Sequence, residues 1–240
     1  MKVCALTQRG SHKEENEDRI VVGKEVVSNG GFCGKFKEGV FAVADGVGGR
    51  NAGAVASGFV AKELSKVDCV DEDTLLSINE ALLAESFRSR SREGMATTLS
   101  GVFIRKGSAL IFSIGNSRVY AFQRGKYLKQ LTTDDTTLNY LISTGKLSAK
   151  DAESFDRKNE ITACFGGGDP DFFEVEISTA EGLRYPFVIT TDGVHDFLDV
   201  DDIERILASN GISEHSCSLI VAAARENGSE DDASVILIET

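Results

Sequence analysis

Apolar and polar residues follow one another along the chain in a pattern that predicts strands in runs and helices in pairs. Short β-rich apolar runs end in turn-forming groups such as Gly115-Asn116-Ser117 and Arg124-Gly125-Lys126, which is typical of an antiparallel meander. The expected strands are Lys2–Thr7, Arg19–Val22, Val40–Ala44, Thr97–Ile104, Ala109–Ile114, Arg118–Phe122, Tyr127–Leu131, Ile161–Cys164, Phe172–Ile177, Phe187–Thr191 and Ala233–Ile238. Spacings of three and four predict helices over Ala52–Val67 (N-cap Asn51), Asp71–Arg92, Val200–Ser209 and Ser213–Asn227. This order favours α+β layers over alternating βαβ units.

The segment Thr132–Glu160 interrupts the run of strands. It is polar and predicts two short helical pieces, with Ser148-Ala149-Lys150-Asp151 resembling a capping box. A polar excursion between strands normally lies at the surface and sometimes acts as a lid. The chain has only 2 prolines and no linker-like stretch, so we expect one domain over 1–240 with a flap-like insertion at about 132–160.

Acidic groups stand at the ends of expected strands that are far apart in the sequence. They are Asn16-Glu17-Asp18, Asp45-Gly46, Asp192-Gly193 and Glu230-Asp231-Asp232. Fixed carboxylates and nearby backbone carbonyls are the oxygen ligands that hard divalent cations prefer. A hairpin turn at Asp45-Gly46 is the alternative, but the following Ala52–Val67 has a helical pattern rather than that of a returning strand. The acidic strand ends therefore predict one shared cation site.

Composition and charge exclude several classes of function. The formal net charge of −12 argues against nucleic-acid binding, which needs clustered Lys and Arg, and is compatible with a carboxylate metal site. No apolar run is long enough to span a membrane and the start lacks a signal-peptide core, so we expect a cytoplasmic protein without membrane contact. The 5 cysteines, without a C-x-x-C pair, predict reduced thiols rather than disulfides or a zinc site. Phosphate-binding glycine motifs are absent as well.

Several motifs occur together in an order that resembles a known family. FAVADGVGG, ITTDGVHDFL, GSEDDASVILI, the early NED, MATTL and GNSR are similar to the metal-dependent serine/threonine protein phosphatases (PPM, type 2C), as a bacterial-type member. The similarity runs from about Gln8 to Ile238. It implies a four-layer αββα sandwich, in which two antiparallel β-sheets are flanked by helix pairs. The segment 132–160 would then be a flap beside the active site.

The resemblance also implies an activity. A member of this family would hydrolyse phosphoserine and phosphothreonine in phosphorylated proteins by direct attack of a metal-bridging hydroxide. Its partners in signalling would include a cognate serine/threonine kinase or its targets. The alternative is a weakly active phosphatase-like module that serves as a binding or sensor protein. A calcium-binding structural domain is a weaker alternative, because the chain has no D-x-D-x-D-G loop.

Position by position, the resemblance implies two Mn²⁺ or Mg²⁺ ions as cofactors. Asp45 would bridge them, Asp192 and Asp231 would complete the ligands of the first ion, and the Gly46 carbonyl would bind the second. Glu17 and Asp18 would act near the second ion through waters. The histidines are not assigned as ligands: His195 is interpreted as a helix-start residue and His12 as a surface residue.

The departures from the family pattern change what we expect of the site. Lys13 stands where the family usually has an arginine that binds substrate phosphate, and lysine keeps the charge but loses the bidentate fork. Asn116 stands where many bacterial members have an aspartate for a third, loosely bound ion, so a third site would be weakened. Val47 replaces a histidine that many eukaryotic members carry. Asp232 adds a negative charge where asparagine is common.

Overall fold

The computed structural model describes residues 1–47, 52–152, 155–167, 173–181 and 185–240, and the described strands form two antiparallel sheets. The first sheet has the spatial order β10 (Tyr127–Gln130), β9 (Arg118–Gln123), β12 (Phe187–Thr190), β13 (Ala233–Glu239), β1 (Lys2–Gln8) and β4 (Gly30–Lys35). The second has the order β11 (Glu176–Glu181), β8 (Ser108–Ile114), β7 (Leu99–Arg105), β5 (Gly39–Val47), β2 (Asp18–Val22) and β3 (Glu25–Val27). A short strand, β6 (Ala96–Thr97), pairs with the end of β5.

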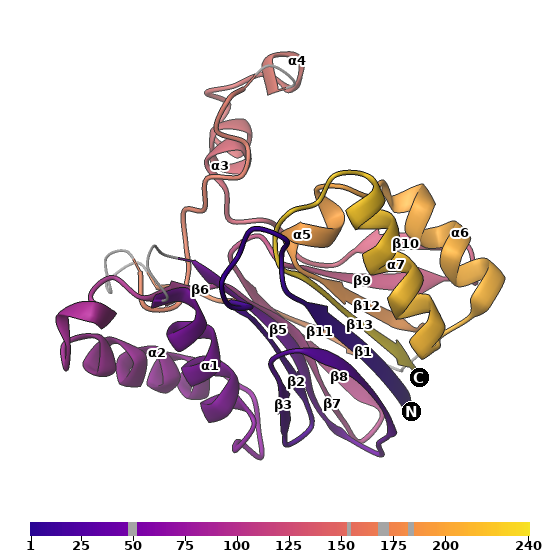
Figure 1. Cartoon of the computed structure of the whole chain (residues 1–240), viewed down its shortest axis with the longest axis horizontal. Helices are drawn as coiled ribbons and strands as arrows, with labels where there is room; N and C mark the ends of the chain where they lie inside the picture. The colour runs from indigo at the N-terminus through magenta and orange to yellow at the C-terminus, as the bar shows by residue number, and fades with distance from the viewer. Residues whose placement is uncertain (48–51, 153–154, 168–172, 182–184) are drawn as a thin grey trace.

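Helix pairs cover the outer faces of the two sheets. In Figure 1, α1 (Ala52–Leu64) and α2 (Glu72–Ser86) lie on one side, and α6 (Val200–Asn210) and α7 (Glu214–Glu226) lie on the other. The two chain ends lie side by side because β1 pairs with β13, with Lys2 opposite Glu239. The predicted fold class, an αββα sandwich of antiparallel sheets between helix pairs, is confirmed.

The apolar core fills the three spaces between these four layers. One cluster lies between the sheets and includes Phe41 and Val43 of β5, whereas Ala42 and Ala44 belong to the cluster under α1 and α2. Successive side chains of a strand point to opposite faces, so β5 contributes to both clusters and reads as a continuous apolar run. A third cluster joins β12 and β13 to α6 and α7. The strands that end in acids are thus buried on both faces.

The helices expected from Asp71 and Ser213 begin at these positions, and one helix end needs correction. Asp71 caps α2 by accepting from Thr74 N, and Ser213 caps α7 by accepting from Ser216 N. The predicted N-cap Asn51 lies outside the described residues. The second helix was expected to reach Arg92 but ends at Ser86, because Ser89 caps a separate 3₁₀ turn over Arg90–Arg92.

Two expected strands differ in the structure. Ile161–Cys164 is not a strand: Ile161 and Phe165 form only isolated bridges, with Thr136 and Thr97. The strand expected at Phe172–Ile177 begins at Glu176, and Phe172 lies outside the described residues. Phe173 packs edge-on against Phe165 with ring centroids 5.0 Å apart, so burial rather than sheet pairing accounts for these apolar residues. The short strand β3 and the glycine-containing strand β4, both partly exposed, were not predicted.

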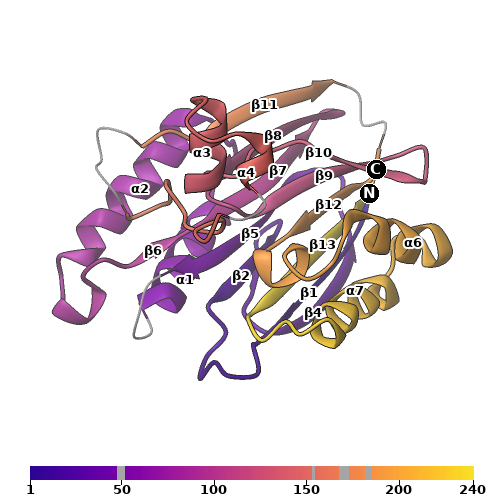
Figure 2. The same ribbon diagram turned by 90° about the horizontal axis from the view of Figure 1, so that it is seen from above.

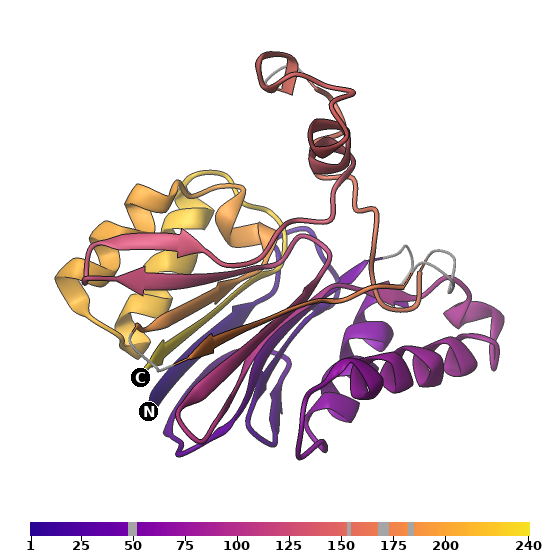
Figure 3. The same cartoon turned by 180° about the vertical axis from the view of Figure 1, so that it is seen from behind.

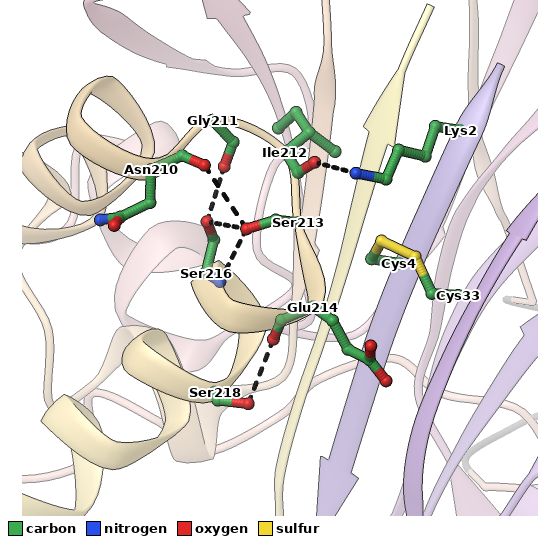
Figure 4. Close-up of a disulfide and its surroundings, with 10 residues drawn as sticks. All are labelled: Lys2, Cys4, Cys33, Asn210, Gly211, Ile212, Ser213, Glu214, Ser216 and Ser218. Atoms are coloured by element: carbon green, nitrogen blue, oxygen red, sulfur yellow. Dashed lines mark hydrogen bonds between the residues drawn. A yellow bond between two sulfur atoms is a disulfide. The ribbon is translucent and has the colours of Figure 1, made fainter.

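A disulfide between Cys4 and Cys33 corrects the prediction of reduced thiols. The two cysteines are 29 residues apart in sequence, but β1 and β4 pair so that they lie directly opposite each other, near the start of α7 (Figure 4). Cysteine spacing alone did not reveal this pairing, because it depends on β4. Cys69, Cys164 and Cys217 are free.

The segment 132–160 rises from one end of the sandwich. Its helices α3 (Thr137–Ser143) and α4 (Ala149–Ala152) stand away from both sheets, as Figures 1 and 3 show. Ser148 and Asp151 interact as the capping-box pattern predicted, with Ser148 Oγ 2.6 Å from Asp151 Oδ2. The base of the segment is fixed to the sandwich by a bidentate ion pair between Arg118 of β9 and Asp134. None of the described helices is long and apolar enough to cross a membrane.

Candidate metal centre

The acidic strand ends meet at one end of the sandwich, the end where α5 (Asp192–His195) and the β1–β2 connection lie in Figure 1 and in the view from above in Figure 2. Asp18 and Asp45 are direct neighbours in the β2–β5 register. Asp192 opens α5 just after β12, and Asp231 precedes β13. β2 pairs with β5 in one sheet and β12 pairs with β13 in the other, so strand pairing brings Asp18 close to Asp45 and the Asp192 region close to the Asp231 region. The face-to-face packing of the two sheets then joins these two pairs, as the hydrogen bonds from Thr191 and Ser234 to Asp18 show.

Asp45 lies in a strand that continues, not in a hairpin turn. β5 runs on through Gly46 to Val47, and β6 pairs with it there, Thr97 lying opposite Gly46. The backbone of Asp45 is fixed on both sides: its N–H donates to Thr98 Oγ1 at 3.1 Å, and its carbonyl accepts from Thr98 N at 2.8 Å. Glycine is required next, since a Cβ at Gly46 would lie 2.3 Å from the Gly53 carbonyl oxygen.

Asp18 is completely buried and only half satisfied by hydrogen bonds. Its Oδ2 accepts from Thr191 Oγ1 at 2.9 Å and from Ser234 Oγ at 2.6 Å. Its Oδ1 has no hydrogen-bond partner among the described residues. Burial, together with repulsion from Asp232 and Asp192, raises the pKa of Asp18 to about 8. The hydrogen bonds from Ser234 and Thr191 oppose this rise.

Asp192 is held from the side by the residue that departs from the family pattern. Asn116 Nδ2 donates to Asp192 Oδ2 at 3.0 Å, while Asn116 Oδ1 is buried and unpartnered within the described chain. Burial, and then repulsion from Asp231, raises the pKa of Asp192. The next residue must be glycine, because a Cβ at Gly193 would lie 1.8 Å from the carbonyl oxygen of Asp232. This close approach places the Asp192 and Asp231 loops against each other.

Burial and mutual repulsion also dominate at Asp45. Burial raises the pKa of Asp45 well above its ordinary value, and repulsion from Asp192, Asp18 and Asp231 raises it further. The carboxylates of Asp18, Asp45, Asp192 and Asp231, which come from two strands, a helix start and a loop, thus act on one another. A bound cation would relieve this repulsion and favour the charged form of each acid.

The outer acids of the site are already paired. Lys13 Nζ lies 2.9 Å from Asp231 Oδ1 and 3.0 Å from Glu17 Oε2. Asp232 is buried and accepts two backbone hydrogen bonds at 2.7 Å, from the N–H groups of Gly10 and Glu17. The sequence predicted Lys13 for substrate phosphate; here its ammonium faces carboxylates instead.

These residues fit a centre for hard divalent cations in kind and in position. The unpartnered buried oxygens of Asp18 and Asn116 point to a missing electropositive partner, and the donors are the oxygen ligands that Mn²⁺ and Mg²⁺ accept. Within the described ranges, however, no three His, Cys, Asp or Glu side chains are already drawn together as a ligand set. Repulsion keeps the buried carboxylates apart, and the ion pairs with Lys13 hold Glu17 and Asp231 away from them.

The histidines stay outside this group of oxygens. His195 ends α5 rather than beginning it; its Nδ1 lies 2.8 Å from Thr190 Oγ1, and burial, with Arg118 nearby, lowers its pKa well below the ordinary value. His12 lies at the surface, with Nδ1 3.1 Å from Glu230 Oε2.

Several residues that shape the site were not found from the sequence. Thr191 and Ser234 hold Asp18, and each stands beside an acidic motif, which is a usable signal. Arg225 of α7 donates to the carbonyls of Gln8, Arg9, Ser229 and Asp231, and thereby joins the two loops that carry the outer acids. Nothing in the local pattern of α7 marks Arg225 for this role.

Comparison with known proteins decides the family. A family model described as protein phosphatase 2C matches residues 29–211. The chain belongs to the protein phosphatase 2C family. The predicted family, and with it the class of serine/threonine phosphatase enzymes, is confirmed.

Known proteins match nearly the whole chain in sequence or in fold. The chain is 28% identical over 250 residues to the serine/threonine phosphatase Stp of Listeria monocytogenes, covering 97% of this chain and 93% of that protein. The crystal structure of the serine/threonine phosphatase Stp1 from Staphylococcus aureus has a TM-score of 0.82 at 24% identity, covering 99% of this chain and 94% of that one. A structure of the PstP catalytic domain in complex with 2 manganese ions has a TM-score of 0.77 at 24% identity, covering 99% and 98%.

Proposed function

We propose that this chain is a metal-dependent phosphoprotein phosphatase that hydrolyses phosphoserine and phosphothreonine with two Mn²⁺ or Mg²⁺ ions. The observation that carries the proposal is the convergence of Asp18, Asp45 and Asp192, whose pKa values are all raised by burial and mutual repulsion, in a protein phosphatase 2C chain. A divalent cation would relieve this repulsion and favour the charged form of each acid. When bound, two such ions supply an activated water for in-line attack on phosphorus and stabilise the charge that develops on the phosphoryl oxygens.

Each acid has a proposed place in this centre. Asp45 would lie between the two ions, Asp192 and Asp231 would hold the first, and the Gly46 carbonyl would hold the second. Glu17 and Asp18 would orient waters around the second ion. The hydrogen bonds from Thr191 and Ser234 hold Oδ2 of Asp18, whereas its Oδ1 has no partner among the described residues, and Asp18 lies opposite Asp45 in the strand register.

The substrates we propose are phosphorylated proteins, including a cognate serine/threonine kinase or its targets. The net charge of −12 gives no surface suited to a nucleic-acid backbone. Asn116 leaves a third ion with an amide oxygen instead of a carboxylate, so a third site would be weak. The segment 132–160 contacts the site region through Asn159, whose Nδ2 donates to Asp196 at the end of α5. We propose that it acts as a flap on protein substrates.

The test is hydrolysis of p-nitrophenyl phosphate and of phosphoserine, phosphothreonine and phosphotyrosine peptides, with Mn²⁺, with Mg²⁺ and with chelator. We expect turnover that requires metal, favours the phosphoserine and phosphothreonine peptides, and is lost in Asp192→Ala. Asp202→Ala on the surface of α6 is the matched control and should keep full activity. Activity in chelator, or activity that survives Asp192→Ala, would overturn the proposal.

A binding or sensor module with weak turnover is the second candidate. Two observations favour it: Lys13 is engaged by Glu17 and Asp231 instead of facing open solvent, and Asn116 carries no charge. Calorimetry that detects metal binding without measurable hydrolysis of any of these substrates would favour this module over the enzyme.

A further inference from the structure

The Lys13 ammonium binds carboxylates that would also bind a metal ion. Its Nζ lies 2.9 Å from Asp231 Oδ1, 3.0 Å from Glu17 Oε2 and 4.0 Å from Asp232 Oδ2. Its side chain is only 35% exposed, and those of Glu17 and Asp232 are 16% and 3% exposed. Three carboxylates thus lie within 4.0 Å of one ammonium nitrogen.

The framework around Lys13 holds the ammonium in this place. Asp232 binds the N–H groups of Gly10 and Glu17, which lie on either side of Lys13 in the loop. Lys13 N itself donates to the Gly10 carbonyl at 3.4 Å. Arg225 ties the same loop, through the carbonyls of Gln8 and Arg9, to the loop that carries Asp231. The Cα of Lys13 and its partner carboxylates therefore belong to one connected unit.

Lys13 carries a positive charge beside these carboxylates. Its ammonium nitrogen lies at hydrogen-bond distance from two carboxylates, whose negative charge favours the protonated form of the amine. The site thus contains a permanent positive charge supplied by the chain. A carboxylate oxygen that accepts an ammonium proton at hydrogen-bond distance is not free to face a metal, and two cations at short range repel.

We propose that Lys13 is an internal counter-ion that competes with divalent metal for Asp231 and Glu17. The inference rests on the proposed function, because it takes these acids as part of the metal centre. In the metal-free protein, the ammonium stabilises the outer carboxylates. Metal binding must displace it, which lowers metal affinity and releases the ammonium to face the substrate phosphate. An arginine at this position would keep the charge and change only its geometry.

The experiment measures Mn²⁺ affinity by calorimetry on the purified full chain without phosphate or substrate. We expect Lys13→Met to bind Mn²⁺ on the order of tenfold more tightly than the original protein, as removal of one nearby positive charge predicts. Lys13→Arg should stay within about twofold, because the charge is kept. Lys24→Met removes a lysine that pairs with Asp68 at a distance of 3.3 Å on an exposed surface, and serves as the matched control with unchanged affinity.

Thermal unfolding in chelator gives an independent readout. Lys13→Met should unfold at a lower temperature than the original protein without metal and should gain more from added Mn²⁺. If Lys13→Met does not fold, Lys13→Gln provides the same comparison. Unchanged Mn²⁺ affinity and an unchanged unfolding temperature in both neutral variants would overturn the counter-ion role alone. Failure of the original protein to bind Mn²⁺ or Mg²⁺ at all would instead overturn the proposed function.

Discussion

The buried and the outer acids of the site are held by the fold in opposite ways. Asp18 and Asp45 lie opposite each other in β2 and β5, Asp192 opens α5, and burial together with repulsion raises all three pKa values. Glu17, Asp231 and Asp232 lie in the loops, where Lys13 and two backbone N–H groups already balance their charge. We call Asp18, Asp45 and Asp192 the inner half of the site, and Glu17, Asp231 and Asp232 the outer half. Without metal, repulsion between buried acids destabilises the inner half, whereas the acids of the outer half have partners that stabilise their charge.

This difference indicates which part of the centre drives metal binding. The inner acids gain most from a cation, because nothing within the described chain neutralises them. The outer acids give up existing partners when they turn toward a metal. We infer that the inner half supplies the affinity and that the outer half adjusts it. The following predictions test whether the two halves really respond with opposite sign.

Substitution of one acid in each half should give the largest contrast. Asp45→Asn removes a central acid and should lower metal-dependent kcat/KM on the order of a thousandfold, as expected when a key electrostatic group is lost. In chelator the same variant should unfold at a higher temperature, because buried repulsion is relieved. Glu17→Gln should lower the unfolding temperature in chelator, because Lys13 loses a partner and no repulsion on the inner acids is relieved. Stability changes of the same sign in both variants would contradict the division into two halves.

The pH dependence of the metal-free protein should report the inner half. An acid whose pKa is raised in the folded state binds more protons there than in the unfolded chain, so stability is greatest below the unfolded pKa and is lost as pH rises toward the folded pKa. For Asp18 this window runs from about 3.8 to about 8. Urea unfolding in chelator should therefore show stability falling across that range. Saturating Mn²⁺ should remove the decline, and a flat profile without metal would contradict the destabilised inner half.

The inner acids lie in or directly after buried apolar strands, which is where the sequence placed them. Asp45 and Asp192 each follow a continuous apolar run, and such a run is buried on both faces of a sheet, so its end marks a fixed carboxylate. The fold class followed from the same runs together with the helix periodicity. Asp18 was placed correctly at a strand edge, although its hydroxyl partners Thr191 and Ser234 were not recognised.

The outer half depends on contacts that no local pattern encodes. Lys13 reaches Asp231 across more than two hundred residues, and Arg225 reaches Gln8 in the same way. Such pairs depend on how loops lie after the sheets have formed. The Cys4–Cys33 disulfide was missed for the same reason, since it requires the register of β1 with the unpredicted strand β4. Periodicity predicts elements; side-chain partners between loops require the assembled fold.

Substitution of Asp232 tests how much its two backbone hydrogen bonds stabilise the outer half. Its two oxygens accept separate N–H groups, from Gly10 and Glu17, at 2.7 Å each. Asp232→Ala leaves both buried donors without a partner and should lower the free energy of unfolding by about 3 kcal/mol. Asp232→Asn keeps one accepting oxygen and should lose roughly half as much. Denaturant unfolding in chelator measures both, and an Asn variant as unstable as the Ala variant would rule out the two-acceptor account.

Asn116→Asp should give the smallest and most specific change. At present Asn116 Nδ2 donates to Asp192 Oδ2 at 3.0 Å, while its own Oδ1 has no partner within the described residues. An aspartate loses that donor and places a second negative charge against Asp192, so the metal-free protein should become less stable. With Mn²⁺ at millimolar levels, the added charge should strengthen a third site and raise turnover on the order of threefold.

Metal titration of activity separates this effect from a simple structural one. Asn116→Asp should show an additional activation phase at high Mn²⁺, whereas Asn116→Ala, which also loses the donor to Asp192 but adds no charge, should not. If activity and its metal dependence are the same in Asn116→Asp as in the original protein, the amide is not what limits a third ion. In that case the repulsion in the inner half would be set by Asp18, Asp45 and Asp192 alone, and Asn116 would serve only to orient Asp192.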